Sequence, residues 1–262
     1  MGKLIFIGLG LGNEKGITLK GLEAASQCEK LFMESYTSTL EEGSVKRLES
    51  MIDNQIVILN RAGVENESII VEAASQSNVA FLVPGDTMSA TTHVDLRLRA
   101  KEAGIPTEVI HGVSVFTAIP GLLGLQNYKF GRTITIPFPE PNFRPTSFYE
   151  KALENHNTGM HTLCLLDIKQ DKNRFMTAND ALQVLGDIEK EMAGGLVPEN
   201  RLVCVVARAG SDDVLVKAGP FNEMITEDFG GPLHSVVLPG RLHFLEAKAL
   251  VELAGAPDSI IQ

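Results

Sequence analysis

Short apolar runs alternate with amphipathic stretches through the first part of the chain. Apolar runs rich in valine, isoleucine and phenylalanine are typical of buried strands, whereas apolar residues three or four positions apart are typical of helices. This pattern predicts helices at about 18–28 and 91–103, further helical stretches elsewhere, and strands at 3–8, 30–34, 55–60, 79–85 and 106–112. Because strands alternate with helices, we expect a parallel α/β sheet.

The pattern changes in the segment 133–147, which holds four prolines. Proline has no N–H to donate to a sheet, so we expect a lid or linker here and not a central strand. Ser147 and Glu150 have the spacing of a capping box at the start of a helix that ends near Gly159.

The rest of the chain predicts antiparallel pairing. Two apolar runs separated by Ser211 and Asp212 are typical of a hairpin. We expect one more strand at 233–240 and helices at about 177–192 and 242–255. The sequence therefore predicts two α/β domains, residues 1–112 with a parallel sheet and residues 113–262 with a mixed sheet.

The composition is that of an ordinary globular protein, with 44% hydrophobic and 21% charged residues among 262. The formal net charge of −10 argues against a surface that binds nucleic acid directly, because phosphate binding needs clustered lysine and arginine. No apolar run approaches the roughly 18 residues of a membrane helix, so we expect no membrane association.

The three cysteines, Cys28, Cys164 and Cys204, are widely spaced and form no C-x-x-C motif. They are expected to be free buried thiols in the reducing cytoplasm. No Cys/His cluster or H-E-x-x-H motif is present, and we therefore predict no metal site.

The glycines of the first loop, Gly8, Gly10 and Gly12, allow two interpretations. A dinucleotide-binding motif needs a further glycine where this chain has Asn13, although Glu34 lies 22 residues beyond Gly12, near the place of a ribose-binding acid. Alternatively, the glycines let a different cofactor approach the backbone. These residues alone leave both interpretations open.

Small and polar residues gather at four predicted transitions from strand to loop. These transitions are at 8–12, 84–93, 111–118 and 165–169. Open α/β sheets bind ligands at the carboxyl ends of their strands, so we expect the ligand site at these loops.

Four features of the first half of the chain occur together in one group of enzymes: the glycine-rich first loop, ITLKGLEAA (17–25), the Gly85–Asp86 turn and HGVSVFTA (111–118). On these features the chain resembles the tetrapyrrole-methylase family, the class III methyltransferases that use S-adenosylmethionine. Further motifs along almost the whole chain resemble the diphthine synthases of that family: ESYTS (34–38), PGDTMSATTHVDLRLRAK (84–101), YKFG (128–131), HTLCLLDIK (161–169), ARAGS (207–211) and LPGRLHFLEAK (238–248). The compact length of the chain resembles that of archaeal members.

This resemblance implies a cofactor folded into a cleft between the two domains and disfavours the dinucleotide interpretation. Carried over position by position, it implies cofactor contacts from Leu11, Asp86, Ser89, Ser114, Val115, Leu166, Ala209 and His234. Each also has a structural interpretation. An aspartate after Pro-Gly commonly forms a turn, a serine such as Ser114 commonly caps a helix, and a lone histidine before a strand is commonly structural.

The resemblance further implies the reaction. The substrate would be the amino group of a 3-amino-3-carboxypropyl arm on a histidine of translation elongation factor 2, methylated repeatedly to give diphthine by a homodimeric enzyme. The sequence identifies no general base, because Glu140 and Asp167 are more simply explained as surface or turn carboxylates. The alternatives are a relative that methylates a corrinoid precursor or ribosomal RNA, and a module that binds S-adenosylmethionine without catalysis.

Overall fold

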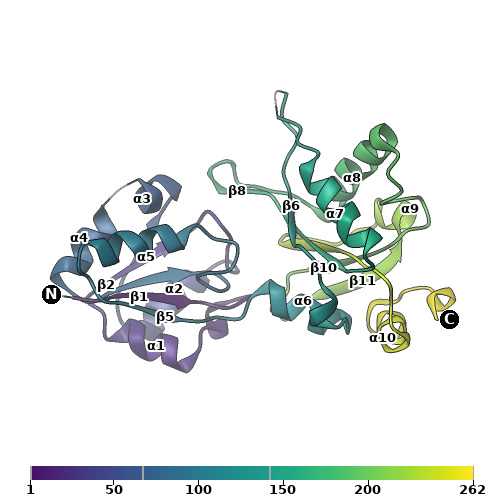
Figure 1. Ribbon diagram of the computed structural model, residues 1–262. Helices are drawn as coiled ribbons and strands as arrows, with labels where there is room; N and C mark the ends of the chain where they lie inside the picture. The colour runs from purple at the N-terminus through teal and green to yellow at the C-terminus, as the bar shows by residue number, and fades with distance from the viewer. Residues whose placement is uncertain (1, 67, 142, 262) are drawn as a thin grey trace. The chain divides into compact units, whose positions relative to one another are not determined.

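The computed structural model describes residues 2–66, 68–141 and 143–261, and the chain forms two compact units (Figure 1). The first unit ends at Val115 and also includes Gly210–Asp212. The second unit comprises Phe116–Ala209 and the chain from Asp213 onward.

The first unit contains a five-stranded sheet in the order β3-β2-β4-β1-β5. Every neighbouring pair is parallel, as the alternating pattern predicts. The strands are β1 (Leu4–Gly8), β2 (Lys30–Glu34), β3 (Ile56–Leu59), β4 (Val79–Val83) and β5 (Thr107–Ile110). β1 and β4 are buried along their whole length, because they lie inside the sheet with both faces covered.

Helices cover both faces of this sheet. Since successive side chains of a strand point to opposite faces, Leu4 and Phe6 pack into one apolar cluster, and Ile5 and Ile7 pack into another. Figure 1 shows α4 and α5 on one side of the sheet and α1 on the other. The helical elements are η1 (Glu14–Gly16), α1 (Leu19–Ser26), α2 (Ser44–Ile52), α3 (Arg61–Glu65), α4 (Ile69–Gln76) and α5 (His93–Glu102).

The second unit contains a five-stranded mixed sheet in the order β11-β10-β12-β7-β6. β6 and β7 are parallel, and the other pairs are antiparallel, including the predicted hairpin of β10 and β11. The strands of the sheet are β6 (Ile134–Ile136), β7 (Thr162–Leu166), β10 (Leu202–Ala207), β11 (Leu215–Pro220) and β12 (His234–Leu238). β8 (Ile168–Lys169) and β9 (Arg174–Phe175) form a separate small hairpin.

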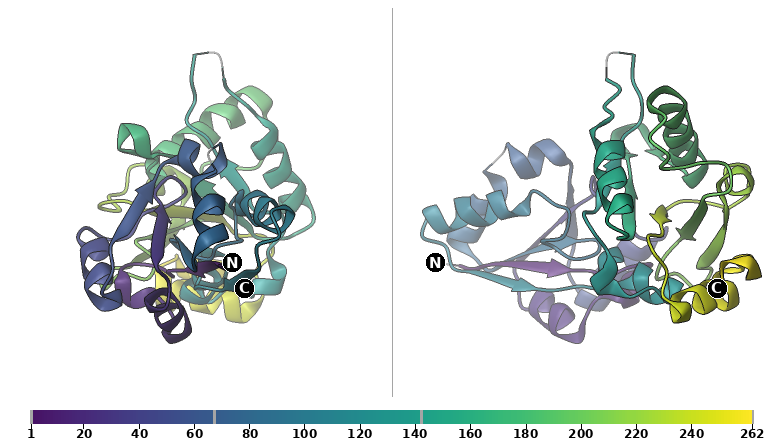
Figure 2. Two further views of the ribbon diagram at one scale, coloured as in Figure 1. Left: turned by 90° about the vertical axis from the view of Figure 1, so that its left-hand side faces the viewer. Right: turned by 45° about the vertical axis from the view of Figure 1, so that its right-hand side comes forward.

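The helices of the second unit are α6 (Val115–Leu123), α7 (Ser147–Asn157), α8 (Ala178–Met192), α9 (Phe221–Met224) and α10 (Phe244–Ala254), with short turns η2 (Asn127–Lys129), η3 (Gln170–Lys172) and η4 (Asp258–Ile260). α7 and α8 pack their apolar side chains against one face of the sheet. Figure 2 shows α7 and α8 side by side, and Tyr149 of α7 donates to Glu189 of α8 at 2.8 Å.

One prediction for the second unit is confirmed only in part, and another is wrong. The proline-rich segment forms no central strand, as expected, but Ile134–Ile136 at its start is an edge strand beside β7 and not part of a lid or linker. The four prolines follow this strand and so remove none of its donors. The capping box at Ser147 is wrong. The helix is capped by Thr146, without a side-chain hydrogen bond, and Ser147 is already its first residue.

The three cysteines are free and buried, as their spacing predicts. Among the helices within the described residues, none combines the length and apolar character needed to cross a membrane.

Candidate functional site

Three loops meet at the carboxyl edge of the first sheet, after β1, β4 and β5. Gly10 and Gly85 exchange backbone hydrogen bonds of 3.1 and 2.7 Å. A Cβ on Gly8 would lie 2.4 Å from the nitrogen of Gly112, so the first loop needs glycine there to pack against its neighbour. At Gly85, where φ is +77°, an added Cβ would meet no atom within 4 Å. The turn after β4 therefore has open space beside its backbone.

The Asp86 carboxylate organises this turn. One oxygen accepts hydrogen bonds from the Met88 N–H at 3.0 Å and the Ser89 hydroxyl at 3.2 Å. The other contacts His111 Nδ1 at 2.7 Å and accepts from the Gly112 N–H at 3.3 Å. Burial opposes ionisation of Asp86, but these hydrogen bonds outweigh it and lower the pKa of the carboxyl.

These contacts occupy the roughly four acceptor positions that a carboxylate offers. Asp86 thus links the loop after β4 to the loop after β5 and shapes its own turn, as the turn interpretation expected. His111 was not singled out from the sequence, although its segment was. Its side chain is 74% exposed, so it lies at the open side of this edge.

The other predicted residues of the first unit share this edge. Leu11 lies in the loop after β1, Ser89 lies in the Asp86 turn, and Ser114 and Val115 follow β5. All four are partly exposed. The structure therefore places Leu11, Ser89 and Ser114 on three neighbouring loops, and Val115 at the start of α6, directly after the loop that follows β5.

The predicted residues of the second unit also share one edge of their sheet. Ala207, the last residue of β10, pairs with His234, the first residue of β12. Since Val236 pairs with Cys164 in the antiparallel ladder of β12 and β7, the same register brings His234 opposite Leu166. Ala209 follows β10 at the same end.

The ring of His234 is engaged within the fold. Its Nδ1 accepts from the Ala178 N–H at 3.1 Å, at the start of α8. Its Nε2 therefore carries the hydrogen and donates to the Gly231 carbonyl at 2.9 Å. Burial lowers the pKa of His234 and keeps this ring neutral. Both ring nitrogens of His234 therefore have partners within the fold.

The two carboxylates considered as bases also have partners. Glu140 forms an ion pair with Lys169, and Asp167 accepts from the Phe138 N–H at 3.0 Å. Neither contact indicates proton transfer, and the catalytic base remains unassigned.

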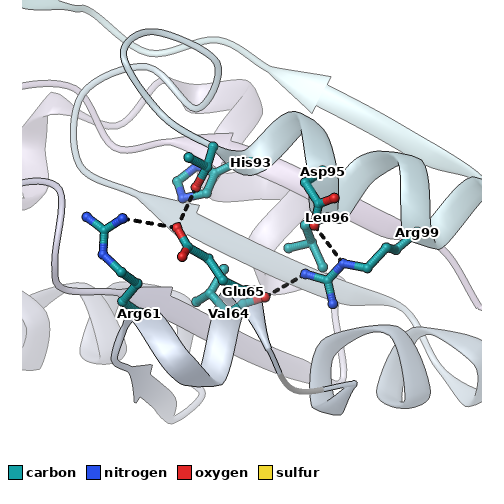
Figure 3. A pocket seen from close by; sticks show the side chains of 8 residues that line it. Arg61, Val64, Glu65, His93, Asp95, Leu96 and Arg99 are labelled. Atoms are coloured by element: carbon teal, nitrogen blue, oxygen red, sulfur yellow. Dashed lines mark hydrogen bonds and ion pairs between the residues drawn. The ribbon is translucent and has the colours of Figure 1, made fainter.

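A cavity of about 280 Å³ lies between α3 and α5 of the first unit (Figure 3). Glu65 accepts from Arg61 at 3.2 Å and from Thr92 at 2.8 Å, while Arg99 pairs with Asp95 at 2.9 Å. Because its two arginines are paired with two carboxylates, the cavity offers no net charge to a ligand. It contains none of the predicted site residues.

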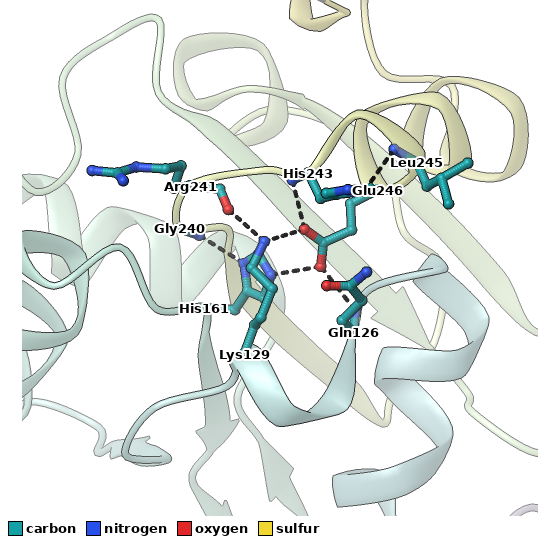
Figure 4. A network of polar contacts seen from close by, with 8 residues as sticks. All are labelled: Gln126, Lys129, His161, Gly240, Arg241, His243, Leu245 and Glu246. Carbon is teal, nitrogen blue, oxygen red and sulfur yellow. Dashed lines mark hydrogen bonds and ion pairs between the residues drawn. The ribbon is translucent and has the colours of Figure 1, made fainter.

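A buried network in the second unit explains several of the sequence motifs (Figure 4). Glu246 accepts hydrogen bonds from Lys129, from His161 Nε2 at 3.0 Å, and from the N–H groups of Gln126 and His243 at 2.9 and 2.8 Å. Burial alone would raise the pKa of Glu246, but these donors lower it to about 2. The network joins η2, the residue before β7 and α10, so the motifs that supply it serve the fold.

Comparisons with known proteins agree along nearly the whole chain. Residues 3–225 match the family model for tetrapyrrole (corrin/porphyrin) methylases. The diphthine synthase of Methanothermobacter thermautotrophicus is 45% identical over 99% of this chain and 98% of its own length. That of Methanosarcina acetivorans is 44% identical, again over 99% of this chain and 98% of its own. A crystal structure of diphthine synthase superposes with a TM-score of 0.89 at 36% identity, covering 98% of each chain.

Proposed function

The chain is a member of the tetrapyrrole methylase family, and from that premise we infer that it is an S-adenosylmethionine-dependent methyltransferase of diphthamide biosynthesis. The observation that carries this inference is its similarity to diphthine synthases, in sequence and in fold, over nearly the whole chain. The mixed second sheet and the parallel first sheet are those expected for the family.

The proposed substrate is a protein. The relatives are diphthine synthases, and this name points to the modified histidine of elongation factor 2, whose amino group would be methylated repeatedly to diphthine. Such a reaction needs an unprotonated amine held in line with the methyl group, so orientation supplies much of the rate enhancement.

The carboxyl edge of the first sheet fits the cofactor. The open space beside Gly85 leaves the turn backbone accessible, and Leu11, Ser89, Ser114 and Val115 lie partly exposed on the adjoining loops. When bound, S-adenosylmethionine supplies a methyl group activated by a sulfonium. The role proposed for these residues is to bind the cofactor, with Asp86 holding the turn that presents Ser89.

Leu166, Ala209 and the main chain of His234 are proposed to contact the cofactor as well. Support comes from their common place at one edge of the second sheet. If this is correct, Ala209→Val should weaken binding of S-adenosylhomocysteine, because a larger side chain would occupy ligand space. Undiminished affinity would remove Ala209 from the site.

Thermal unfolding with added ligands tests the cofactor assignment. S-adenosylhomocysteine should raise the thermal midpoint, because a ligand that binds only the folded state stabilises it. NADH should leave the midpoint unchanged. A shift with NADH alone would favour the dinucleotide interpretation of the first loop. Binding of S-adenosylhomocysteine without methyl transfer to any elongation factor 2 would favour the non-catalytic alternative.

The enzyme is further proposed to be a cytoplasmic homodimer. The buried free thiols support a reducing compartment. Phe244, Leu245 and Leu253 of α10 are 63%, 55% and 57% exposed, which supports an apolar contact between copies. Analytical ultracentrifugation should show a dimer that Leu253→Glu dissociates, and a monomeric wild-type protein would contradict the proposal.

A further inference from the structure

A chain of buried polar groups lies behind the Asp86 turn. Thr87, the residue after Asp86, is fully buried. Its carbonyl accepts from the Thr91 hydroxyl at 2.8 Å and contacts His93 Nδ1 at 3.1 Å. The Thr87 hydroxyl has no partner within the described part of the chain. The turn is therefore attached to the fold beneath it through this carbonyl and not through the Thr87 side chain.

The protonation of His93 follows from these contacts. A carbonyl oxygen only accepts hydrogen bonds, so Nδ1 must carry a hydrogen. Burial lowers the pKa of His93, whose exposure is 1%, and the ring is neutral. Its Nε2 therefore accepts a hydrogen bond, and the Tyr36 hydroxyl donates to it at 3.3 Å.

Tyr36 is held from the other side by Glu34, the last residue of β2. The Glu34 carboxylate is fully buried and accepts from the N–H groups of Tyr36 at 2.9 Å and Thr37 at 3.0 Å. The ring of His93 also packs edge-on against Phe81 of β4, with centroids 5.0 Å apart. The polar chain thus connects the loop after β2 to the residue next to Asp86.

We propose that Tyr36 and His93 are positioning residues, which fix the Asp86 turn in the form that binds the cofactor. The link to the cofactor rests on the proposed function, whereas the positioning of the turn does not. Tyr36 and His93 are 9% and 1% exposed, and the hydrogen bonds described here for their side chains involve none of the predicted cofactor residues. Their effect must pass through the Thr87 carbonyl.

Two histidine variants separate the two contacts of His93. His93→Asn keeps an N–H donor near the position of Nδ1 and can still reach the Thr87 carbonyl. His93→Gln places its amide near Nε2 and loses that contact. Tyr36→Phe removes the hydroxyl that His93 accepts from, which also forms a hydrogen bond with Thr92. Tyr149→Phe is the matched control, because Tyr149 is likewise a buried tyrosine, donates to Glu189 at 2.8 Å, and lies in the second unit.

The first measurement is amide hydrogen exchange in the ligand-free protein. The Met88 N–H reports on the turn, because it donates to Asp86. We expect it to exchange at least about fivefold faster in Tyr36→Phe and His93→Gln, the change expected for loss of one buried hydrogen bond. His93→Asn should recover part of the protection, and Tyr149→Phe should leave the Met88 N–H unaffected.

The second measurement is affinity for S-adenosylhomocysteine by calorimetry, well below the thermal midpoint of each variant. Tyr36→Phe and His93→Gln should bind about fivefold or more weakly, with a raised KM for S-adenosylmethionine and an unchanged kcat. His93→Asn should bind more tightly than His93→Gln even where their thermal midpoints are equal.

Unchanged exchange at Met88 in Tyr36→Phe and His93→Gln would overturn the proposal, whatever the affinities. Faster exchange with unchanged affinity would also overturn it. If the wild-type protein bound no S-adenosylhomocysteine, the proposed function would fail, and the exchange of Met88 would still decide whether Tyr36 and His93 position the turn.

Discussion

At the scale of single residues, buried carboxylates with several hydrogen-bond donors hold the loops of this protein in place. Glu34, Asp86 and Glu246 are each less than a tenth exposed, and each accepts from backbone N–H groups. A buried carboxylate is costly unless it is paired and hydrogen-bonded. Glu246 is paired with Lys129 and accepts from groups distant in sequence, whereas the hydrogen-bond donors to Glu34 come from the loop that it shapes.

Replacing Asp86 tests the cofactor-binding turn. Asp86→Ala should weaken binding of S-adenosylhomocysteine by about tenfold or more, because it removes charge-assisted hydrogen bonds worth roughly 1.5–3 kcal/mol. Calorimetry measures the change. Asp95→Ala, an exposed carboxylate on α5 of the same unit, serves as the control. Equal affinities for Asp86→Ala and the wild type would exclude Asp86 from the site.

Glu246 makes stability depend on pH. Its pKa is lowered to about 2 from 4.5, so the unfolded chain binds the proton more readily than the folded one. The stabilisation is present above about pH 4.5 and should be lost as the pH falls toward 2.

Glu246→Gln should lower the free energy of unfolding by ~1–3 kcal/mol at neutral pH, because buried donors lose a charged acceptor. It should also reduce the loss of unfolding free energy as the pH falls from about 4.5 toward 2. Urea unfolding at a series of pH values measures both effects. Glu252→Gln, at an exposed position of α10, is the control. A Glu246→Gln protein as stable as Glu252→Gln would show that the network around Glu246 contributes nothing to the stability of the fold.

At the scale of elements, the starts of α7 and α8 show what local sequence can determine. Both are preceded by a threonine, Thr146 and Thr177. Only Thr177 forms a capping box, in which its side chain accepts from the Asp180 N–H at 3.0 Å and Asp180 accepts in return. Spacing alone favoured Ser147 and Glu150, one residue too late along the chain.

Two alanine variants compare these helix starts. Thr177→Ala should cost about 1 kcal/mol of stability, because it leaves an N–H of the first turn without its partner. Ser147→Ala, at an exposed position inside the first turn of α7, should change stability by less than about 0.5 kcal/mol. Urea unfolding followed by circular dichroism distinguishes the two, and equal losses would contradict this assignment of the caps.

The strands were more predictable than the helix ends. β1 to β5 lie within the ranges expected from the sequence, because apolar runs bounded by polar residues are strong local signals. β6 was missed because three residues before a group of prolines carry little signal of their own. The short β8–β9 hairpin was missed for the same reason, since each of its strands has two residues.

At the scale of the whole molecule, the topology explains why the site was only partly predictable. Parallel strands bring their carboxyl ends to one edge, so the convergence of the loops after β1, β4 and β5 follows from the α/β pattern. The contact between Asp86 and His111 spans 25 residues and depends on the strand order β4-β1-β5. Local sequence does not determine that order. It also does not determine the contact between Tyr36 and His93, which are distant in the sequence.

The central claim is methyl transfer to elongation factor 2. The most direct measurement is incubation of the protein with methyl-labelled S-adenosylmethionine and elongation factor 2 carrying the unmethylated 3-amino-3-carboxypropyl histidine, followed by mass spectrometry of the modified peptide. Label on the amino group of that arm, absent when the arm is absent, is the expected result. Label on ribosomal RNA or a corrinoid precursor, with none on the arm, would contradict the claim.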